Sequence, residues 1–330
     1  MKRNTLFVAA VLLLVACTLC HAQRPAREDL LARAAAISAA AHPDADAVLV
    51  WDHTFESYRP DGTGASTNEW YEKILTEKGR RESRTASFWM DAAYGSVAVC
   101  LAEIVKPDGT AVAIDVARNS RLMIDPGQMA SNIFDPNSKI LTLALPGLDV
   151  GDVLHLVVAR ETTKARVPDA FGDYAVFEHT SPVVEMIHEI AAPAARPLQT
   201  IRVRDEIGGG VAYEALPQTD GGTLHRWRVK DVPQAFPEPD MPPIHTCAQR
   251  LLVSTIPTWQ DLSRWYWKLS EPRMAAIVPE MQEAVDALVS GAATRDERIW
   301  RVFTYVSQKI RYMGVTPGRR RRATSRTTSS

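Results

Sequence analysis

The stretch TLHRWRVK at residues 223–230 shows the pattern that decides the fold of this chain. Within it, Trp227 and Val229 alternate with Arg226 and Arg228, so apolar side chains recur at every second position. Successive side chains of a strand point to opposite faces of a sheet, so this alternation indicates a strand with one face on the core and the other face polar. The stretch therefore predicts an antiparallel sheet that is covered on one side.

Similar strand-like runs extend from Asp46 to about Thr255 and are separated by turn residues. Pro107-Asp108-Gly109 separates an apolar run at 97–105 from another at 110–116, which predicts a hairpin. Many short strands between frequent turns are typical of sandwiches and barrels. We therefore predict a mainly β fold with a large antiparallel β-sandwich domain over residues 46–256.

Helical spacing appears on both sides of this region. Leucines and alanines between Arg27 and Ala41 predict a short helix that Pro43 ends. After residue 256, Thr258 is suited to cap a first helix, a second helix ends near Gly291, and a third follows. The third helix begins at the capping box Thr294-Arg295-Asp296-Glu297. Its apolar residues at spacings of four, three and four form one stripe: Ile299, Phe303, Val306 and Ile310.

The N-terminus has the form of a signal peptide. Lys2 and Arg3 precede a short apolar run at residues 6–16, and the small residue Ala22 provides a cleavage point. The run is shorter than the ~20 residues that span a bilayer. A lipobox-like Leu14-Val15-Ala16-Cys17 is the alternative, in which Cys17 would be acylated and would anchor a lipoprotein to the membrane. We predict cleavage after Ala22 and a periplasmic or secreted protein.

The net charge of −1 conceals an acidic body. Lys2, Arg3, Arg319–Arg322 and Arg326 contribute seven positive charges at the ends of the chain, and removing them leaves about −8. An acidic body argues against nucleic acid as the partner. Residues 317–330 are rich in Arg, Ser and Thr and have too little apolar surface to fold, so we predict a disordered, solvated tail. The sequence after the signal segment predicts no transmembrane helix.

Two of the 4 cysteines, Cys17 and Cys20, lie in the export segment, which leaves Cys100 and Cys247. An oxidising compartment would permit a disulfide between these two. Cys100 lies in the apolar run Ser96–Leu101, however, and the sequence favours a buried thiol in a strand.

No pattern in the sequence identifies a catalytic, cofactor or metal site. His188-Glu189 lacks the second histidine of a zinc-protease helix, and His245 with Cys247 supplies only two ligands. The Gly208–Gly210 run has no following Lys-Ser/Thr and predicts a hairpin turn instead of a phosphate loop. Four aromatic residues of the helical region are expected to pack in a core: Trp265, Tyr266, Trp267 and Trp300.

Several segments carry a family resemblance. YEKILT at 71–76, IVKPDGT at 104–110 and LPGLDVGDV at 145–153 resemble the domain of unknown function 3857 (DUF3857). WQDLSRWY at 259–266 and YVSQKIRYMG at 305–314 resemble the start of the bacterial transglutaminase-like domains that follow it. The resemblance implies a domain order: signal peptide 1–22, helix and linker 23–45, β domain 46–256, first helices of a papain-like α+β domain 257–316, and tail 317–330.

The resemblance also implies cysteine-dependent amide hydrolysis or acyl transfer by a Cys–His–Asp triad. Sixteen residues follow Gly314, and none of them is Cys, His or Asp. We therefore expect an exported protein that lacks the catalytic part and is inactive, through either a native truncation or a shifted reading frame. The alternative is a non-catalytic periplasmic binding or scaffolding protein whose partner is a protein or peptide, with or without a lipid anchor at Cys17. Neither interpretation calls for a cofactor.

Overall fold

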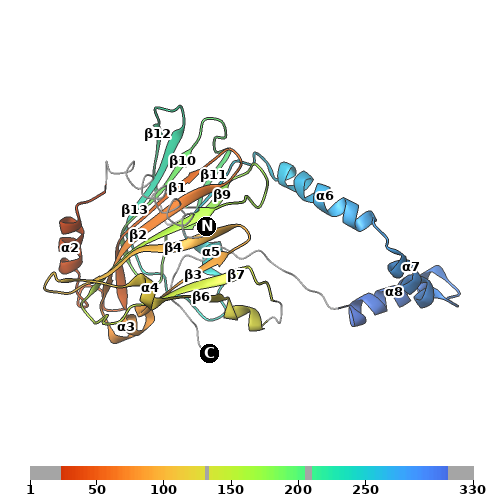
Figure 1. Ribbon diagram of the computed structural model, residues 1–330, viewed down its shortest axis with the longest axis horizontal. Coiled ribbons are helices and arrows are strands. Elements are labelled where there is room, and N and C mark those ends of the chain that lie inside the picture. Colours follow the sequence, from red (N-terminus) through yellow and green to blue (C-terminus); the bar gives the residue numbers. More distant parts are fainter. Residues whose placement is uncertain (1–23, 131–133, 205–209, 311–330) are drawn as a thin grey trace, which may run out of the picture. The chain divides into compact units, whose positions relative to one another are not determined.

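The computed structural model describes residues 24–130, 134–204 and 210–310 (Figure 1). Contacts divide the chain into two compact units. The β unit contains the described parts of Met1–Pro126 and Asp135–Ile256, and the helical unit contains those of Gly127–Phe134 and Pro257–Pro317. The signal segment with Cys17 and Cys20, the Arg-rich tail and most of the Gly208–Gly210 run lie outside the described residues.

An eight-stranded sheet forms the centre of the β unit, in the order β12-β13-β10-β1-β2-β8-β4-β5. Its strands are β1 (Ala47–Tyr58), β2 (Gly64–Ile74), β4 (Gly95–Val105), β5 (Ala111–Ala113), β8 (Val153–Thr162), β10 (Val183–Ala192), β12 (Ala212–Pro217) and β13 (Thr223–Val232). Every neighbouring pair is antiparallel except β1 and β10, which are parallel. The large sheet is therefore mixed.

Two three-stranded antiparallel sheets accompany the large one. One has the order β3-β7-β6, formed by β3 (Thr85–Asp91), β7 (Ser138–Ala144) and β6 (Ser120–Ile124). The other has the order β11-β14-β9, formed by β11 (Thr200–Arg204), β14 (Arg250–Ser254) and β9 (Gly172–Val176).

One short helix precedes the first strand, and others connect later strands. They are α2 (Arg27–Ala36), α3 (Glu77–Ser83), α4 (Val116–Asn119), the 3₁₀ helix η2 (Pro126–Ala130) and α5 (Ile244–Cys247). The N-terminal helix α2 ends at Ala36, earlier than the stop predicted at Pro43. Ile37 is already extended there, and its N–H donates to the carbonyl of Ala34.

Both small sheets pack on the same face of the large sheet. In one core cluster, Phe88 of β3 and Leu143 of β7 contact Leu156 and Val158 of β8. In the other, Leu251 and Val253 of β14 and Ala175 of β9 pack with Met186 of β10 and Trp227 of β13. Residues that are paired across neighbouring strands point to the same face of the sheet. Thr54 of β1 is paired with His188 of β10 and with Asn68 of β2, and Asn68 is paired with Val158 of β8. His188 and Val158 therefore lie on the same face.

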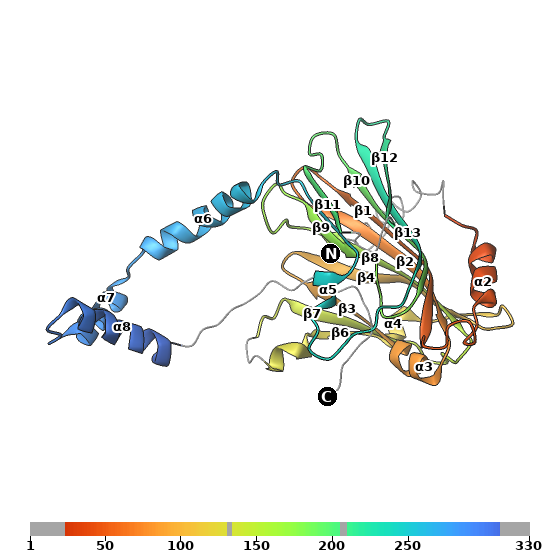
Figure 2. The same cartoon turned by 180° about the vertical axis from the view of Figure 1, so that it is seen from behind.

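The opposite face of the large sheet carries α2. Leu30 and Ala34 of the helix are fully buried against Trp51 and Tyr71. Figures 1 and 2 show α2 on the other side of the large sheet from β7 and β9. The large sheet is therefore the middle layer of the β unit.

The helical unit consists of α6 (Trp259–Ala275), α7 (Pro279–Val289) and α8 (Arg295–Lys309), together with the short segment around η2. The Thr258 hydroxyl accepts from the Asp261 N–H, and the Thr294 hydroxyl accepts from the Glu297 N–H at 3.1 Å, as the capping patterns predict. The Glu297 carboxylate accepts from the Ala293 N–H, whereas a capping box predicts the N–H of Thr294 as the donor. None of the helices among the described residues is long and apolar enough to cross a membrane.

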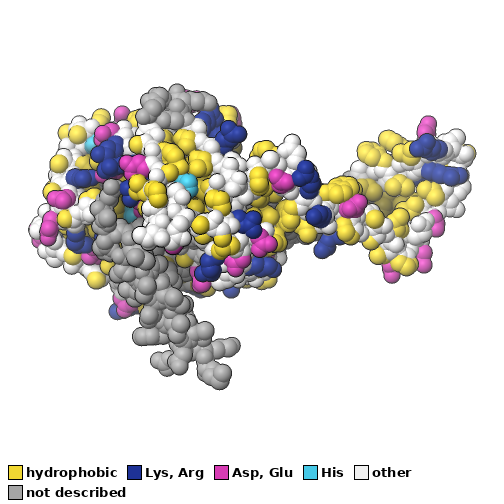
Figure 3. Space-filling model, turned by 90° about the horizontal axis from the view of Figure 1, so that it is seen from above, with side chains coloured by type: hydrophobic (Ala, Val, Ile, Leu, Met, Phe, Trp, Pro, Cys, Tyr) yellow, Lys and Arg dark blue, Asp and Glu magenta, His cyan; other side chains and the backbone are white. Residues whose placement is uncertain are grey.

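The apolar stripe of α8 is exposed. Ile299, Phe303, Val306 and Ile310 each retain half or more of their accessible surface, and Figure 3 shows hydrophobic side chains over the surface of the helical unit. Tyr266, Trp267 and Trp300, predicted to lie in a core, are also more than half exposed. Three helices with the short η2 segment provide too little apolar surface to enclose them.

The mainly β fold with a following helical segment is confirmed, as is the hairpin of β4 and β5. The prediction of a buried Cys100 is wrong, because this residue is exposed at a bulge in β4 between Val99 and Leu101. Ser96, Ala98 and Cys100 alternate with the inward-facing Val97 and Val99, so Cys100 points away from the core. The segment with His245 and Cys247 forms the short helix α5 instead of a strand.

Candidate functional site

A cavity of about 180 Å³ lies on the covered face of the large sheet, over β1 and β2. Its walls come from β3 and α3 on one side and from β9 and the loop at 179–181 on the other. We call this cavity the cleft. Six carboxylates line it: Asp46, Asp52, Glu56, Glu72, Glu82 and Asp173.

Strand β1 supplies the polar floor of the cleft. Asp52, Thr54 and Glu56 alternate along the strand and point to one face, and all three are less than a tenth exposed. A register shift between Leu49 and Trp51 sets this phase, so Trp51 faces α2 instead. An alternating polar face usually faces water, but here the two small sheets enclose it.

Asn68 of β2 holds this floor together. Its amide Nδ2 donates to Asp52 Oδ1 at 2.7 Å and to Thr54 Oγ1 at 3.0 Å. It also lies 3.3 Å from the carbonyl oxygen of His53. Because buried polar groups are costly unless they are hydrogen-bonded, this network fixes the Asp52 carboxylate in place.

Glu72 lies at the α3 end of the cleft. Its Oε2 accepts from the Ser83 hydroxyl at 3.3 Å. Burial raises the pKa of Glu72 to about 7. The hydrogen bond from Ser83 lowers this pKa, and the negative charge of Glu82 raises it further. The charge of the cleft therefore changes near neutral pH.

The close approach of α3 at this end requires a glycine. A Cβ on Gly79 would lie 2.1 Å from the Asp46 carbonyl oxygen, well inside contact distance. The Thr76 hydroxyl caps the helix by accepting from the Gly79 N–H and donates to Asp46 Oδ1 at 2.7 Å. These contacts hold Asp46 at the rim of the cleft.

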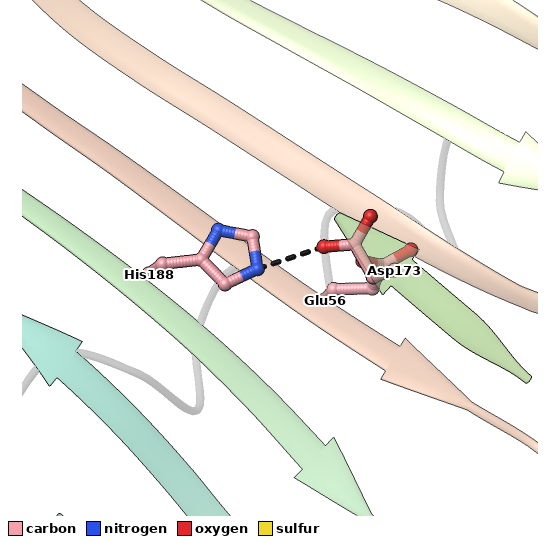
Figure 4. Close-up of side chains that lie close together, drawn as sticks. All are labelled: Glu56, Asp173 and His188. Carbon is pink, nitrogen blue, oxygen red and sulfur yellow. Dashed lines mark ion pairs between the residues drawn. The ribbon is translucent and has the colours of Figure 1, made fainter. Parts of the chain in front are cut away.

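At the opposite end, Glu56, Asp173 and His188 form a compact cluster. They come from β1, β9 and β10, and each offers a ligand atom within 4.8 Å of the other two. Asp173 Oδ2 lies 2.9 Å from His188 Nε2. Figure 4 shows both carboxyl groups on the side of the imidazole ring that bears this nitrogen.

Arg160 of β8 is the only Lys or Arg among the described residues that line the cleft. Its Nη1 donates to the Trp89 carbonyl oxygen of β3 at 2.8 Å, which joins the large sheet to the small one. His179 and His188 are the remaining basic side chains in the described lining. With six carboxylates around it, the cleft is suited to a cationic ligand.

His188 and Glu189 are neighbours in the sequence, but the strand directs their side chains to opposite faces of the sheet. Glu189 is 3% exposed on the α2 side, where His53 Nε2 lies 2.8 Å from it and Arg226 Nε donates at 2.6 Å. Burial alone would raise the pKa of Glu189, but the bonds from His53 and Arg226 outweigh it and hold the pKa below its ordinary value. Sequence patterns did not predict that Glu56 and Asp173 lie beside His188. The Asp-x-Thr-x-Glu alternation of β1 indicates only that one face of this strand is polar.

Cys100 and Cys247, the cysteines among the described residues, are exposed thiols and line no part of the cleft. No disulfide joins these two described residues.

The fold of this chain is also found in a solved structure. A crystal structure from Parabacteroides distasonis, described as a "putative protease", matches with a TM-score of 0.66 at 16% identity. The match covers 79% of this chain and 50% of that one, so this chain spans about half the length of the matched protein. A CBM3a-L domain of a Clostridium thermocellum scaffoldin matches with a TM-score of only 0.23, at 10% identity, over 36% of this chain and 69% of that one.

The fold is thus that of a β-rich domain also present in the Parabacteroides protein. No curated protein matches the chain. Residues 60–236, more than half of the sequence, match the family described as a domain of unknown function with a solved structure, DUF3857, and the chain belongs to this family.

Proposed function

We propose that the β unit is a non-catalytic binding module that takes a cationic side chain of a peptide or protein into the cleft. The observation that supports this proposal is the ring of six carboxylates around a cavity on the covered face of the sheet. Asp52 and Glu56 lie at its floor, each about 5% exposed or less. Cationic groups are attracted to a concave site of this sign, where low-dielectric walls strengthen the field.

The size of the cleft limits what can enter. A volume of about 180 Å³ is smaller than the ~300–1,000 Å³ of typical small-molecule pockets. It suits one long side chain, such as lysine or arginine, whose apolar stem would contact Trp70 and Phe88 in the lining. The ligand would then be a peptide that presents a single cationic residue.

The setting of this module belongs to the same proposal. The resemblance of residues 259–266 and 305–314 to transglutaminase-like domains, and the fold shared with the "putative protease", support a family in which the β domain precedes a catalytic domain. We propose that this chain is exported, with cleavage after Ala22 favoured over acylation of Cys17, and that neither Cys100 nor Cys247 acts as a nucleophile. Mass spectrometry of the mature N-terminus distinguishes the two forms of processing.

Isothermal titration calorimetry of the secreted chain with acetyl-Gly-Lys-Gly-amide tests the binding proposal. We expect saturable binding that weakens with added salt and no binding of the Glu analogue. Asp52→Asn removes a charge from the cleft while keeping an acceptor for Asn68, and should weaken binding at least about tenfold. The matched control Asp296→Asn removes an exposed carboxylate of α8 and should leave the affinity unchanged. Equal binding of the Lys and Glu peptides, or equal loss in both variants, would refute the proposal.

The absence of catalysis is tested separately. A peptide amide substrate and a thiol-directed probe are incubated with the chain and with Cys100→Ser and Cys247→Ser. Amide hydrolysis that disappears in either variant would show a catalytic cysteine and overturn that part of the proposal.

A further inference from the structure

We propose that Glu56, Asp173 and His188 bind a divalent transition-metal ion in the wall of the cleft. The three side chains come from three strands, β1, β9 and β10, and from two different sheets (Figure 4). Two carboxylates and one imidazole are ligand types that proteins use for Zn²⁺, Mn²⁺ and Fe²⁺. This inference does not depend on peptide binding by the cleft.

The distances fit metal ligation after a small adjustment. Asp173 Oδ2 and His188 Nε2 are 2.9 Å apart, which matches the ~3 Å between adjacent ligands of an octahedral ion with bonds of ~2.1 Å. All three ligand atoms lie within 4.8 Å of one another, compared with the ~4.2 Å between ligands on opposite sides of such an ion. The largest of these separations therefore exceeds the span of such an ion by at most about 0.6 Å.

Burial favours an ion at this position. Glu56 is 4%, Asp173 8% and His188 2% exposed, so the cluster is shielded from bulk water. Buried carboxylates are paired or coordinate a metal, and a divalent cation would bind both of these carboxylates. The rigid strands supply the ligands in a fixed arrangement, as a preorganised site requires.

The cleft leaves the proposed site open on one side. All three residues are part of its lining, so three protein ligands would face a space large enough for water or for a ligand atom of a bound molecule. A set of three protein ligands with a free position is typical of open metal sites, whereas structural sites are closed by four. The single imidazole and the small number of oxygens argue against Ca²⁺, which takes six to eight oxygen ligands.

The test is direct metal binding by the full secreted chain after dialysis against EDTA. Titration with MnCl₂, followed by loss of the free Mn²⁺ electron paramagnetic resonance signal, and calorimetry with ZnCl₂ should each give one ion per chain. CaCl₂ at the same concentration should bind at least about tenfold more weakly. The metal should also raise the unfolding temperature, because it binds only the folded arrangement and joins two sheets.

Variants identify the ligands. Glu56→Gln and Asp173→Asn keep the shape of the side chain, and each should weaken Mn²⁺ binding at least about tenfold. The matched control Asp296→Asn removes an exposed carboxylate of α8, outside the cleft, and should keep the wild-type Mn²⁺ affinity. Circular dichroism establishes that each variant is folded, and Glu56→Gln serves alone if Asp173→Asn unfolds.

Absence of stoichiometric Mn²⁺ and Zn²⁺ binding by the wild-type chain would overturn the inference. An unchanged affinity in folded Glu56→Gln, or an equal loss in Asp296→Asn, would do the same. Peptide binding without metal binding would refute this inference alone, and metal binding without peptide binding would refute only the proposed function.

Discussion

His188 Nε2 lies 2.9 Å from Asp173 Oδ2, although the two residues belong to different sheets. His188 is on β10 in the large sheet, and Asp173 is on β9 at the edge of a small sheet. The apolar cluster around Met186 and Ala175 packs the same two strands together. The small sheet thus brings an acidic side chain to a polar strip of the large sheet, which creates one end of the cleft.

The pKa of Glu72 predicts an unusual pH dependence of stability. Burial raises it to about 7 from an ordinary value near 4.5, so the folded state binds more protons between these values than the unfolded state. Glu72 therefore contributes stability that is present below pH ~4.5 and is lost as the pH rises through ~7. At pH 8, Glu72→Gln should unfold with a free energy higher than wild type by on the order of 1–3 kcal/mol. Urea unfolding at several pH values measures this, and parallel profiles of the two proteins would contradict it.

The same titration should affect ligand binding. A deprotonated Glu72 adds a negative charge to the lining of the cleft. Affinity for the lysine peptide of the proposed function should therefore increase between pH 6 and pH 8, and this increase should be absent in Glu72→Gln.

The packing of the β3-β7-β6 sheet on the large sheet can be tested at Leu143. This side chain is fully buried in the cluster that contains Phe88 and Leu156. Leu143→Ala should lower the free energy of unfolding by ~2–5 kcal/mol through lost burial and a new cavity. Leu122→Ala on the adjacent strand β6 removes a side chain that is 51% exposed, and should change it by less than ~0.5 kcal/mol. Similar urea midpoints for the two variants would show that this sheet does not pack as described.

Glu189 on the other face should be important for stability. It accepts from Arg226, which is 11% exposed, and pairs with His53. Glu189→Gln removes the buried carboxylate that pairs with Arg226 and His53, and should destabilise the fold by about 3 kcal/mol at pH 7. Glu214→Gln removes the exposed second partner of Arg226 and should lower stability by less than ~1 kcal/mol. Thermal unfolding of both variants measures the difference, and equal effects would contradict the assignment.

Because its pKa is depressed, Glu189 stabilises the fold above its unfolded-state pKa, and this contribution is lost as the pH falls through the folded-state value. The wild-type protein should therefore lose part of its advantage over Glu189→Gln in acid.

The Thr294 cap should determine the stability of the start of α8. Its hydroxyl accepts from the Glu297 N–H at 3.1 Å. Thr294→Ala should destabilise this helix by about 1 kcal/mol and speed hydrogen exchange of the Glu297 amide. Ser307→Ala, within the same helix, removes an exposed hydroxyl that is not a cap and should leave that exchange rate unchanged. Equal rates in Thr294→Ala and wild type would refute the role of the cap.

Local patterns were enough to predict most strands and all three helices of the helical unit. The alternation at 223–230 correctly placed Trp227 and Val229 in the core and Arg226 and Arg228 on the other face. Helix caps were equally visible, because they depend on side chains within one turn of the backbone. The exposure of Cys100 was missed, because the apolar residue types of Ser96–Leu101 do not show which face of the strand is left uncovered.

The cleft could not be predicted in the same way. Asp52, Thr54 and Glu56 alternate as the residues of a solvent-facing strand face do. No neighbouring residue in the sequence indicates that two other sheets enclose them. The parallel pairing of β1 with β10 is equally invisible, because side-chain alternation is the same in both strand directions. This pairing is what places His188 beside the floor of the cleft.

By itself, the sequence determined the secondary structure, the mainly β class and the change to helices after residue 256, because each depends on interactions between residues close along the chain. Only the tertiary structure decided which polar side chains meet. Glu56, Asp173 and His188 are distant in sequence. They are brought together by the pairing of β1 with β10 and by the packing of a hydrophobic cluster that contains none of them. The physical reason is that burial of apolar surface is non-directional, so it draws sheets together without specifying in any local motif which charges will lie between them.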